Sequence, residues 1–239
     1  RWRFTLGREW VVTAREEAGL CNLCVGTGNG AEQVEACLDG DYATGRQEER
    51  RGTGHAVMMA ESYLKGYSGK NVLILCGDAP FMDEETIQEA LKTHVEQDNA
   101  VTVVTACLPD PTGYGRILRD GDAVTGIVEQ KDATEEQRAI REVNSGAYWF
   151  KVDDLLSVLH KLTCGNAQGE YYLTDTVSLL IGVGKRAGAY CSKDSDVVLG
   201  ANDRRTLCQL NEIARDQILG LHLDHGVEGV HIDRILIAP

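Results

Sequence analysis

The sequence predicts an α/β fold with a mixed, mostly parallel sheet, helices on both faces and a long C-terminal helix. Two observations predict it. Short apolar runs alternate with segments of helical periodicity along most of the 239-residue chain, and this alternation favours a largely parallel sheet covered by helices. The last periodic segment, residues 204–225, is also the longest, and its apolar residues recur every three or four positions.

The elements follow in order from the apolar spacing. The predicted strands are residues 20–25, 71–76, 100–107, 124–129 and 147–150, and β-branched residues enrich the third of them. The predicted helices before the C-terminal one are residues 31–38, 55–64, 83–97, 152–162 and 173–184. Between residues 26 and 30 the run GTGNG lacks the full spacing of a dinucleotide-binding loop, and it favours a tight strand-to-helix turn.

Composition narrows the class of protein. The formal net charge is −13, and an acidic chain repels phosphate backbones, so we expect no nucleic-acid partner. No run approaches the length of a membrane span, and no secretory signal pattern is seen, so we expect no membrane partner. The eight cysteines often sit in apolar contexts, which is typical of a reduced cytoplasmic protein. Cys21-x-x-Cys24 lacks the further ligands of a zinc site.

Residues 126–150 combine charged and apolar residues in an unusual order. Thr134 and Gln137 fit a capping box that opens a helix, and we expect this helix to continue to about Val143. Glu129 then stands at the end of one strand, and Asn144 at the start of the next. Ligands collect at strand ends in α/β sheets, so the helix is either a solvated flap beside a site or an ordinary surface crossover.

Two short motifs could carry chemistry. Asp78 ends a hydrophobic strand, where a carboxylate either binds a divalent cation or caps the following turn. The turn that contains Gly52 and Thr53 opens a helix, and glycine-rich turns there present backbone N–H groups to ligands. Residues 165–175, GNAQGEYYLTD, combine amides with two tyrosines, so they form either a sugar-binding wall or a surface loop with a helix cap.

Taken together, these stretches resemble a known family. QEERRGTGHAV, LCGDAPF, PTGYGRI, VEQKDATEEQR, NAQGEYYLTD and GANDR occur in order from about residue 7 to residue 225. They resemble the uridylyltransferase domain of the bacterial bifunctional N-acetylglucosamine-1-phosphate uridylyltransferase/glucosamine-1-phosphate acetyltransferase. The resemblance implies a Rossmann-like fold of the nucleotide-diphospho-sugar transferase type.

The resemblance also implies roles for residues that match the motifs. Gln47, with the turn at Gly52 and Thr53, would recognise the uracil base. Asp78 and Asn202 would hold Mg²⁺. The N-acetylglucosamine pocket would be formed by Gly115, Glu129, Asn144, Tyr172 and Thr174.

The implied reaction joins N-acetylglucosamine 1-phosphate to the α-phosphorus of UTP, which gives UDP-N-acetylglucosamine and pyrophosphate for cell-wall synthesis. The phosphate nucleophile is already ionised, so catalysis would depend on positioning and on charge neutralisation by Mg²⁺. Two alternatives stay open: a nucleotidyltransferase for another sugar 1-phosphate, and a non-catalytic UDP-sugar-binding fragment.

The chain departs from the family pattern at both ends. The family's glycine-rich LAAGxGTRM loop and the lysine after it are not found, so no catalytic residue is assigned. Residues 1–203 are expected to form the nucleotidyltransferase domain without that N-terminal part. Residues 204–225 would form a linker helix, and residues 226–239 the start of a left-handed β-helix domain that is otherwise missing. The family's trimer depends largely on that β-helix, so a homo-oligomer is not assigned.

Overall fold

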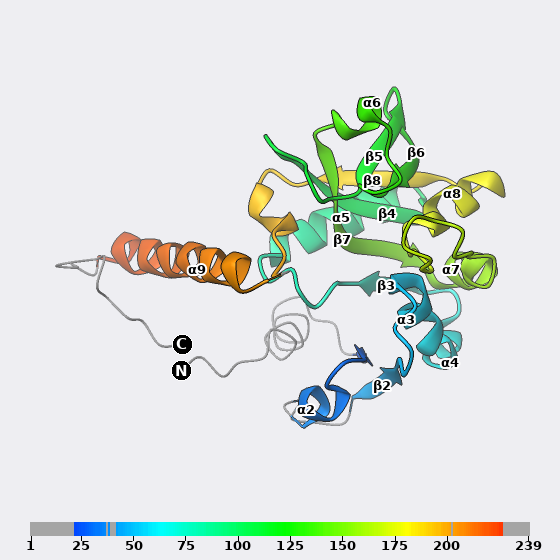
Figure 1. Cartoon of the computed structure of the whole chain (residues 1–239), viewed down its shortest axis with the longest axis horizontal. Coiled ribbons are helices and arrows are strands. Elements are labelled where there is room, and N and C mark those ends of the chain that lie inside the picture. Colours follow the sequence, from blue (N-terminus) through cyan, green and yellow to red (C-terminus); the bar gives the residue numbers. More distant parts are fainter. Residues whose placement is uncertain (1–21, 37, 39–41, 202, 227–239) are drawn as a thin grey trace. The chain divides into compact units, whose positions relative to one another are not determined.

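A computed structural model describes residues 22–36, 38, 42–201 and 203–226. The chain divides into two units, residues 1–198 and 199–239. The first unit holds a two-stranded sheet and a six-stranded sheet with helices (Figure 1). In the second unit, α9 (Arg204–Asp224) begins at a capping box in which Asp203 accepts a hydrogen bond from the Thr206 backbone N–H. This confirms the predicted long C-terminal helix.

The N-terminal part of the first unit forms a parallel strand pair, β1 (Cys24–Thr27) and β2 (Ala43–Arg46). Between them, α2 (Ala31–Glu35) starts directly after Gly30, which has a left-handed backbone (φ 70°). The GTGNG run is therefore the end of a strand and a tight turn, as its spacing predicts. Of the predicted strand at residues 20–25, residues 20 and 21 lie outside the described residues, as does Cys21 of the Cys-x-x-Cys pattern.

The larger sheet has the order β6-β5-β7-β4-β8, and β3 also pairs with β7. Its strands are β3 (Asn71–Ile74), β4 (Val101–Cys107), β5 (Arg116–Asp120), β6 (Ala123–Val128), β7 (Glu142–Lys151) and β8 (Ala187–Cys191). The mixed class is confirmed. The proportion of parallel pairings differs from the expected mostly parallel sheet. Among the described strands of this sheet, β4 and β8 run parallel, while the other pairings are antiparallel. The central strand β7 runs antiparallel to its three partners, β3, β4 and β5.

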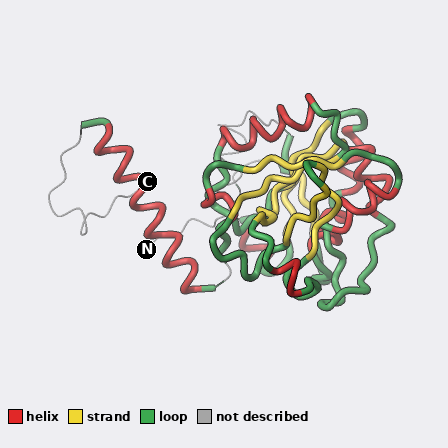
Figure 2. The backbone as a smooth tube through the Cα atoms, turned by 90° about the horizontal axis from the view of Figure 1, so that it is seen from above, coloured by secondary structure: helices red, strands yellow, loops and turns green. Residues whose placement is uncertain are grey.

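Helices cover both faces of this sheet, as predicted (Figure 2). On one face, α7 (Val152–Leu159) and α8 (Asp175–Gly182) pack with alternate β4 and β7 residues such as Val103 and Phe150. On the other face, α5 (Glu84–Glu96) packs on residues such as Val104 and Trp149. The period of two along each strand divides the apolar residues between two cores.

The remaining helices are short. α3 (Thr53–Met59) and α4 (Glu61–Leu64) replace the single helix expected at residues 55–64, and a 3₁₀ turn, Lys65–Tyr67, follows them. A second 3₁₀ turn, Ser195–Val198, ends the first unit. Within the described parts of the chain, no helix is long and apolar enough to cross a membrane.

The segment around Asn144 corrects one prediction. The capping box at Thr134 is present, but α6 (Glu135–Arg138) ends after one turn, and β7 begins at Glu142 rather than at Ala147. The prediction that this helix continues to about Val143 is therefore wrong. Val143, Ser145 and Ala147 are all buried, so the strand period continues through Asn144. Pairing with β4 stabilises this extended backbone more than local helix preference does.

Candidate functional site

Four of the predicted sugar-pocket residues lie together where β5, β6, β7 and α8 meet. The Thr174 hydroxyl donates a hydrogen bond to Glu129 Oε1 at 3.0 Å. The Asn144 backbone N–H donates to the Gly115 carbonyl at 2.9 Å. A Cβ atom on Gly115 would lie 3.3 Å from Glu129 Oε2, so the carboxylate rests against the glycine. The tertiary structure therefore brings Gly115, Glu129, Asn144 and Thr174 into one cluster.

Glu129 is half-buried, and its surroundings change the ionisation of its carboxylate. Burial raises the pKa of Glu129 above its usual value, the hydrogen bond from Thr174 opposes this, and the charges of Asp175 and Asp132 raise it further. Among the described residues, the Thr174 hydroxyl is the one donor that the hydrogen bonds of the structure give to the Glu129 carboxylate, whose two oxygens have lone pairs for further donors. Such a group can orient hydroxyl or amide donors of a ligand.

The side chain of Asn144 is held by a residue that the sequence analysis did not single out. Asn144 Nδ2 donates to the Tyr148 hydroxyl at 2.6 Å, and Asn144 Oδ1 accepts from the Gly146 backbone N–H at 3.0 Å. Asn144, Gly146 and Tyr148 are spaced by two along β7, across the point where its register with β4 shifts. Recognition of the strand start at Glu142 would have revealed this spacing. Burial raises the pKa of Tyr148 well above its usual value, so its hydroxyl keeps its proton.

Cys76 packs under this strand. Gly146 has φ 80°, and a Cβ atom there would lie 2.9 Å from Cys76 Sγ, so a glycine is required by both backbone and space. Burial, followed by the charges of Asp78 and Glu129, raises the pKa of Cys76 to about 12. The thiol is therefore neutral, and it serves as packing beneath the pocket.

The predicted nucleotide side is built around Gln47, which directly follows β2. Its Nε2 donates to the Gly52 carbonyl at 3.0 Å and lies 2.9 Å from His55 Nδ1. Because an amide nitrogen only donates, His55 Nδ1 must accept. Both protons of the Gln47 amide are thus engaged, and Gln47 Oε1 is left as an acceptor, near Gly28.

A short backbone pairing joins the two sides of the candidate site. The Tyr171 backbone N–H donates to the Arg51 carbonyl at 2.8 Å, and the Gly54 N–H donates to the Tyr171 carbonyl at 2.8 Å. The Thr53 hydroxyl accepts from the Leu173 N–H at 3.0 Å. Gly52 has φ 101°, and any Cβ there would lie 2.6 Å from the Tyr171 carbonyl oxygen, so this approach needs glycine.

The two adjacent tyrosines contact different sides of the site. The Tyr171 ring has the Arg51 guanidinium 5.2 Å from its centroid and the His55 ring at 6.2 Å. The Tyr172 ring is buried, 7% exposed, and its hydroxyl accepts from Gln168 Nε2 at 2.8 Å. Tyr171 therefore belongs to the nucleotide side and Tyr172 to the pocket side. The sequence alone did not separate them.

The predicted metal ligands are described only in part. Asp78 lies exposed in the loop that follows β3, and its charge contributes to the raised pKa values of Cys76 and Tyr114. Asn202 lies outside the described residues. In the described part of the chain, no three His, Cys, Asp or Glu residues group together as a metal site. A lone exposed carboxylate fits an Mg²⁺ ion bound mainly through substrate phosphates rather than in a protein cage.

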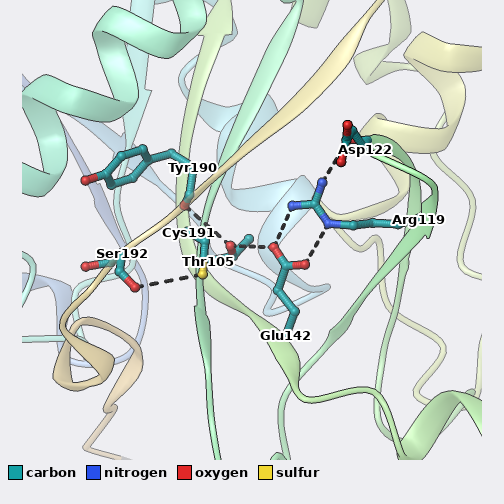
Figure 3. A network of polar contacts seen from close by, with 7 residues as sticks. All are labelled: Thr105, Arg119, Asp122, Glu142, Tyr190, Cys191 and Ser192. Carbon is teal, nitrogen blue, oxygen red and sulfur yellow. Dashed lines mark hydrogen bonds and ion pairs between the residues drawn. The ribbon is translucent and has the colours of Figure 1, made fainter.

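A polar network fixes the strands beside the pocket (Figure 3). Two nitrogens of the Arg119 guanidinium, on β5, each lie 2.7 Å from an oxygen of Glu142, the first residue of β7. The Thr105 hydroxyl, on β4, donates to Glu142 Oε1 at 2.8 Å. Three strands are thereby connected two residues before Asn144, which limits how far the pocket residues can shift.

Comparison with known proteins shows similarity to nucleotidyl transferases. The nucleotidyl transferase family model matches residues 10–202. The protein named "Bifunctional protein GlmU" from Acetivibrio thermocellus is 43% identical over 230 residues, which is 96% of this chain and 50% of that protein. The protein of the same name from Streptococcus equi subsp. zooepidemicus is 45% identical over 201 residues, 84% of this chain and 44% of that protein. The chain spans about half the length of these curated relatives.

A solved structure supports the fold. A Bacillus anthracis protein assigned as a glucose-1-phosphate thymidylyltransferase superposes with a TM-score of 0.68, covering 97% of this chain and 87% of that one, at 17% sequence identity. This likeness bears on the fold alone: the chain has the mixed-sheet architecture of the nucleotide-diphospho-sugar transferases. With the family model matched over most of its length, the chain belongs to the nucleotidyl transferase family.

Proposed function

We propose that this chain forms the uridylyltransferase part of a bifunctional enzyme, in which UMP passes from UTP to N-acetylglucosamine 1-phosphate to give UDP-N-acetylglucosamine and pyrophosphate. The observation that carries the proposal is the joined site. The cluster of Glu129, Thr174, Asn144 and Gly115 is connected to the Gln47 turn through residues 171–173. The similarity to the GlmU protein of Acetivibrio thermocellus extends over 230 residues, 96% of this chain, and this span is long enough to include both halves of the site.

The pocket cluster suits a sugar that carries both donors and acceptors. The Glu129 carboxylate would accept from sugar hydroxyl or amide groups, and the Asn144 side chain is already oriented by Tyr148. On the other side, the Gln47 amide protons are both engaged, so Gln47 can only accept from a base. An acceptor suits the N3–H of uracil and rejects cytosine, which has an unprotonated nitrogen at that position.

The phosphates need help from cations in a chain of net charge −13. Asp78 would hold Mg²⁺ on the pocket side, and Asn202 is the second ligand that the family resemblance implies. When bound, the metal supplies charge neutralisation on the phosphate oxygens. The protein's own residues would bind the base and the sugar and orient them. Such positioning is the larger part of catalysis when the nucleophile is already ionised.

The test is calorimetric titration of the whole chain with UDP-N-acetylglucosamine in the presence of Mg²⁺, with UDP-glucose as the control ligand. We expect saturable binding of the first ligand and at least tenfold weaker binding of the second, because UDP-glucose lacks the acetamido group and the hydrogen bonds that this group would make with the pocket. The Glu129→Gln variant should weaken binding, and the exposed Glu136→Gln variant should leave it unchanged. No binding of either ligand would overturn the proposal, and equal binding would redirect it to another sugar.

A further inference from the structure

Two loops meet at the pocket side of the site. The first, residues 129–133, follows β6, and the second, residues 163–170, lies within the connection between α7 and α8. Lys131 Nζ donates to Gln168 Oε1 at 2.8 Å, and the Ala167 backbone N–H donates to Asp132 Oδ1 at 2.9 Å. The same first loop carries Glu129, which is bonded to Thr174. Contacts with the first loop therefore lie on both sides of Tyr172 in the sequence: at Ala167 and Gln168 before it, and at Thr174 after it.

The contact with Lys131 fixes which way the Gln168 amide faces. A lysine ammonium group has donors and no acceptor, so the Gln168 atom beside it must be the oxygen. The amide nitrogen then faces the Tyr172 hydroxyl, 2.8 Å away. Because an amide nitrogen only donates, the Tyr172 oxygen must accept this bond.

The direction of this bond decides where the Tyr172 proton goes. Since the phenol oxygen accepts from Gln168, its own proton points elsewhere. Burial raises the pKa of Tyr172, while the bond from Gln168 opposes this, so the phenol keeps its proton at neutral pH. Across the described residues, the hydrogen bonds of the structure provide no acceptor for that proton. Tyr172 thus offers a spare donor beside Glu129 and Thr174.

We infer that Gln168 is a positioning residue that holds the Tyr172 hydroxyl as a hydrogen-bond donor to an oxygen atom of the bound sugar nucleotide. Lys131 keeps the Gln168 amide in the required orientation. The inference rests on the proposed function, because it needs a ligand with an acceptor in this pocket. It adds to that function a specific direction for one hydrogen bond and two residues outside the predicted pocket.

The contacts between the two loops can be changed with little effect on stability. Lys131, Asp132 and Gln168 are all exposed, and exposed polar pairs add little to stability. Gln168→Glu preserves side-chain shape and the contact with Lys131, but a carboxylate cannot donate. The Tyr172 proton would then turn toward the carboxylate and be lost to the ligand. We expect UDP-N-acetylglucosamine to bind about tenfold more weakly to this variant.

A double-mutant cycle separates this effect from simple charge repulsion. In a Tyr172→Phe background there is no proton to redirect, so Gln168→Glu should change affinity less than about twofold. Gln209→Glu, a change at another exposed glutamine, on α9, controls for added charge and should leave affinity unchanged. The thermal midpoint of the ligand-free protein should be the same for all Gln168 and Gln209 variants.

The outcomes are distinguishable. If the unmodified chain does not bind UDP-N-acetylglucosamine, the proposed function fails, and the inference falls with it. If the chain binds but Gln168→Glu binds equally well, the positioning role alone is overturned. An equal loss in both the tyrosine and the phenylalanine backgrounds also overturns it, because the effect would then bypass Tyr172.

Discussion

At the residue scale, burial and a hydrogen bond act on the Glu129 carboxyl in opposite directions, and burial prevails, which raises its pKa. The folded protein therefore holds this proton to a higher pH than the unfolded chain does. As pH rises from below the unfolded value through the folded pKa, Glu129 lowers the stability of the fold, and above the folded pKa the cost is complete.

Glu129→Gln removes the loss of stability that ionisation of Glu129 causes. It also replaces one carboxylate oxygen that would accept a hydrogen bond from the ligand. We expect a higher thermal unfolding midpoint at pH 7, no such gain at pH 4, and UDP-N-acetylglucosamine binding weakened by about 10- to 100-fold. Scanning calorimetry at the two pH values and titration at pH 7 measure both effects. An equal gain in midpoint at pH 4 and pH 7 would show that ionisation is not the cause.

A second residue-scale prediction concerns His94, which is fully buried on α5 with Nδ1 3.0 Å from the Thr102 hydroxyl. Burial, aided by the charge of Lys151, lowers its pKa from 6.5 to about 4. The neutral ring is thus required by the fold. Its contribution to stability is complete above pH 6.5 and is lost as pH falls toward 4, by a total of about 3 kcal/mol.

Urea unfolding of the unmodified chain and of His94→Gln, each at pH 7 and pH 4, tests this. The unmodified chain should lose about 3 kcal/mol more than the variant between the two pH values. His222→Gln, an exposed histidine on α9, should behave like the unmodified chain. Parallel losses in all three proteins would contradict the assignment.

At the element scale, the Arg119–Glu142 pair connects β5 to β7 with side chains that are 30% and 15% exposed. Burial raises the pKa of Glu142, but the hydrogen bonds from Arg119 and Thr105 outweigh it and hold the pKa below its usual value. The pair's contribution to stability is therefore present above the unfolded pKa of a glutamate and is lost as pH falls through the lower folded value.

Glu142→Gln should lower the free energy of unfolding by about 1–2 kcal/mol at pH 7, because the charge-assisted, paired geometry is lost. Glu89→Gln breaks a more exposed pair with Lys92, 3.6 Å apart, and should cost at most about 0.5 kcal/mol. Urea titrations at pH 7 compare the two. Equal losses would mean that the network in Figure 3 is no stronger than an ordinary surface pair.

The elements also show where sequence reasoning succeeds. The apolar spacing predicts a helix at residues 83–97, close to the observed α5, whose first turn is capped by Asp83 Oδ1 accepting from the Thr86 N–H. The predicted capping box at Thr134 is also present. The error at α6 arose because charges after Thr134 suit a helix, while the extended backbone from Glu142 is stabilised by pairing with β4. That partner is distant in the sequence, so no local window contains it.

At the scale of the whole molecule, the net charge of −13 predicts no affinity for nucleic acid. A labelled 20-base-pair DNA duplex should show no saturable change in fluorescence anisotropy at roughly 0.1 M salt, because binding would place like charges together. Saturable binding under these conditions would contradict the prediction and would indicate a local cationic surface stronger than the overall field.

The division of residues 1–203, 204–225 and 226–239 into domain, linker and partial second domain stays a prediction. The structure divides the chain after Val198 and contains α9 in the second unit. Asn202, the second expected metal ligand, lies outside the described residues. The sugar, the base and the metal are parts of the proposed function, and the titrations above test the sugar.

The sequence by itself determined the α/β class, most of the elements and the motifs that place the chain in its family, because apolar periodicity and capping are properties of neighbouring residues. The tertiary structure decided which side chains meet. Thr174 bonds Glu129 from 45 positions away, Tyr171 and Tyr172 contact different sides, and Lys131 orients Gln168. These contacts depend on how the strands and helices pack, and partners far apart along the chain leave no local pattern.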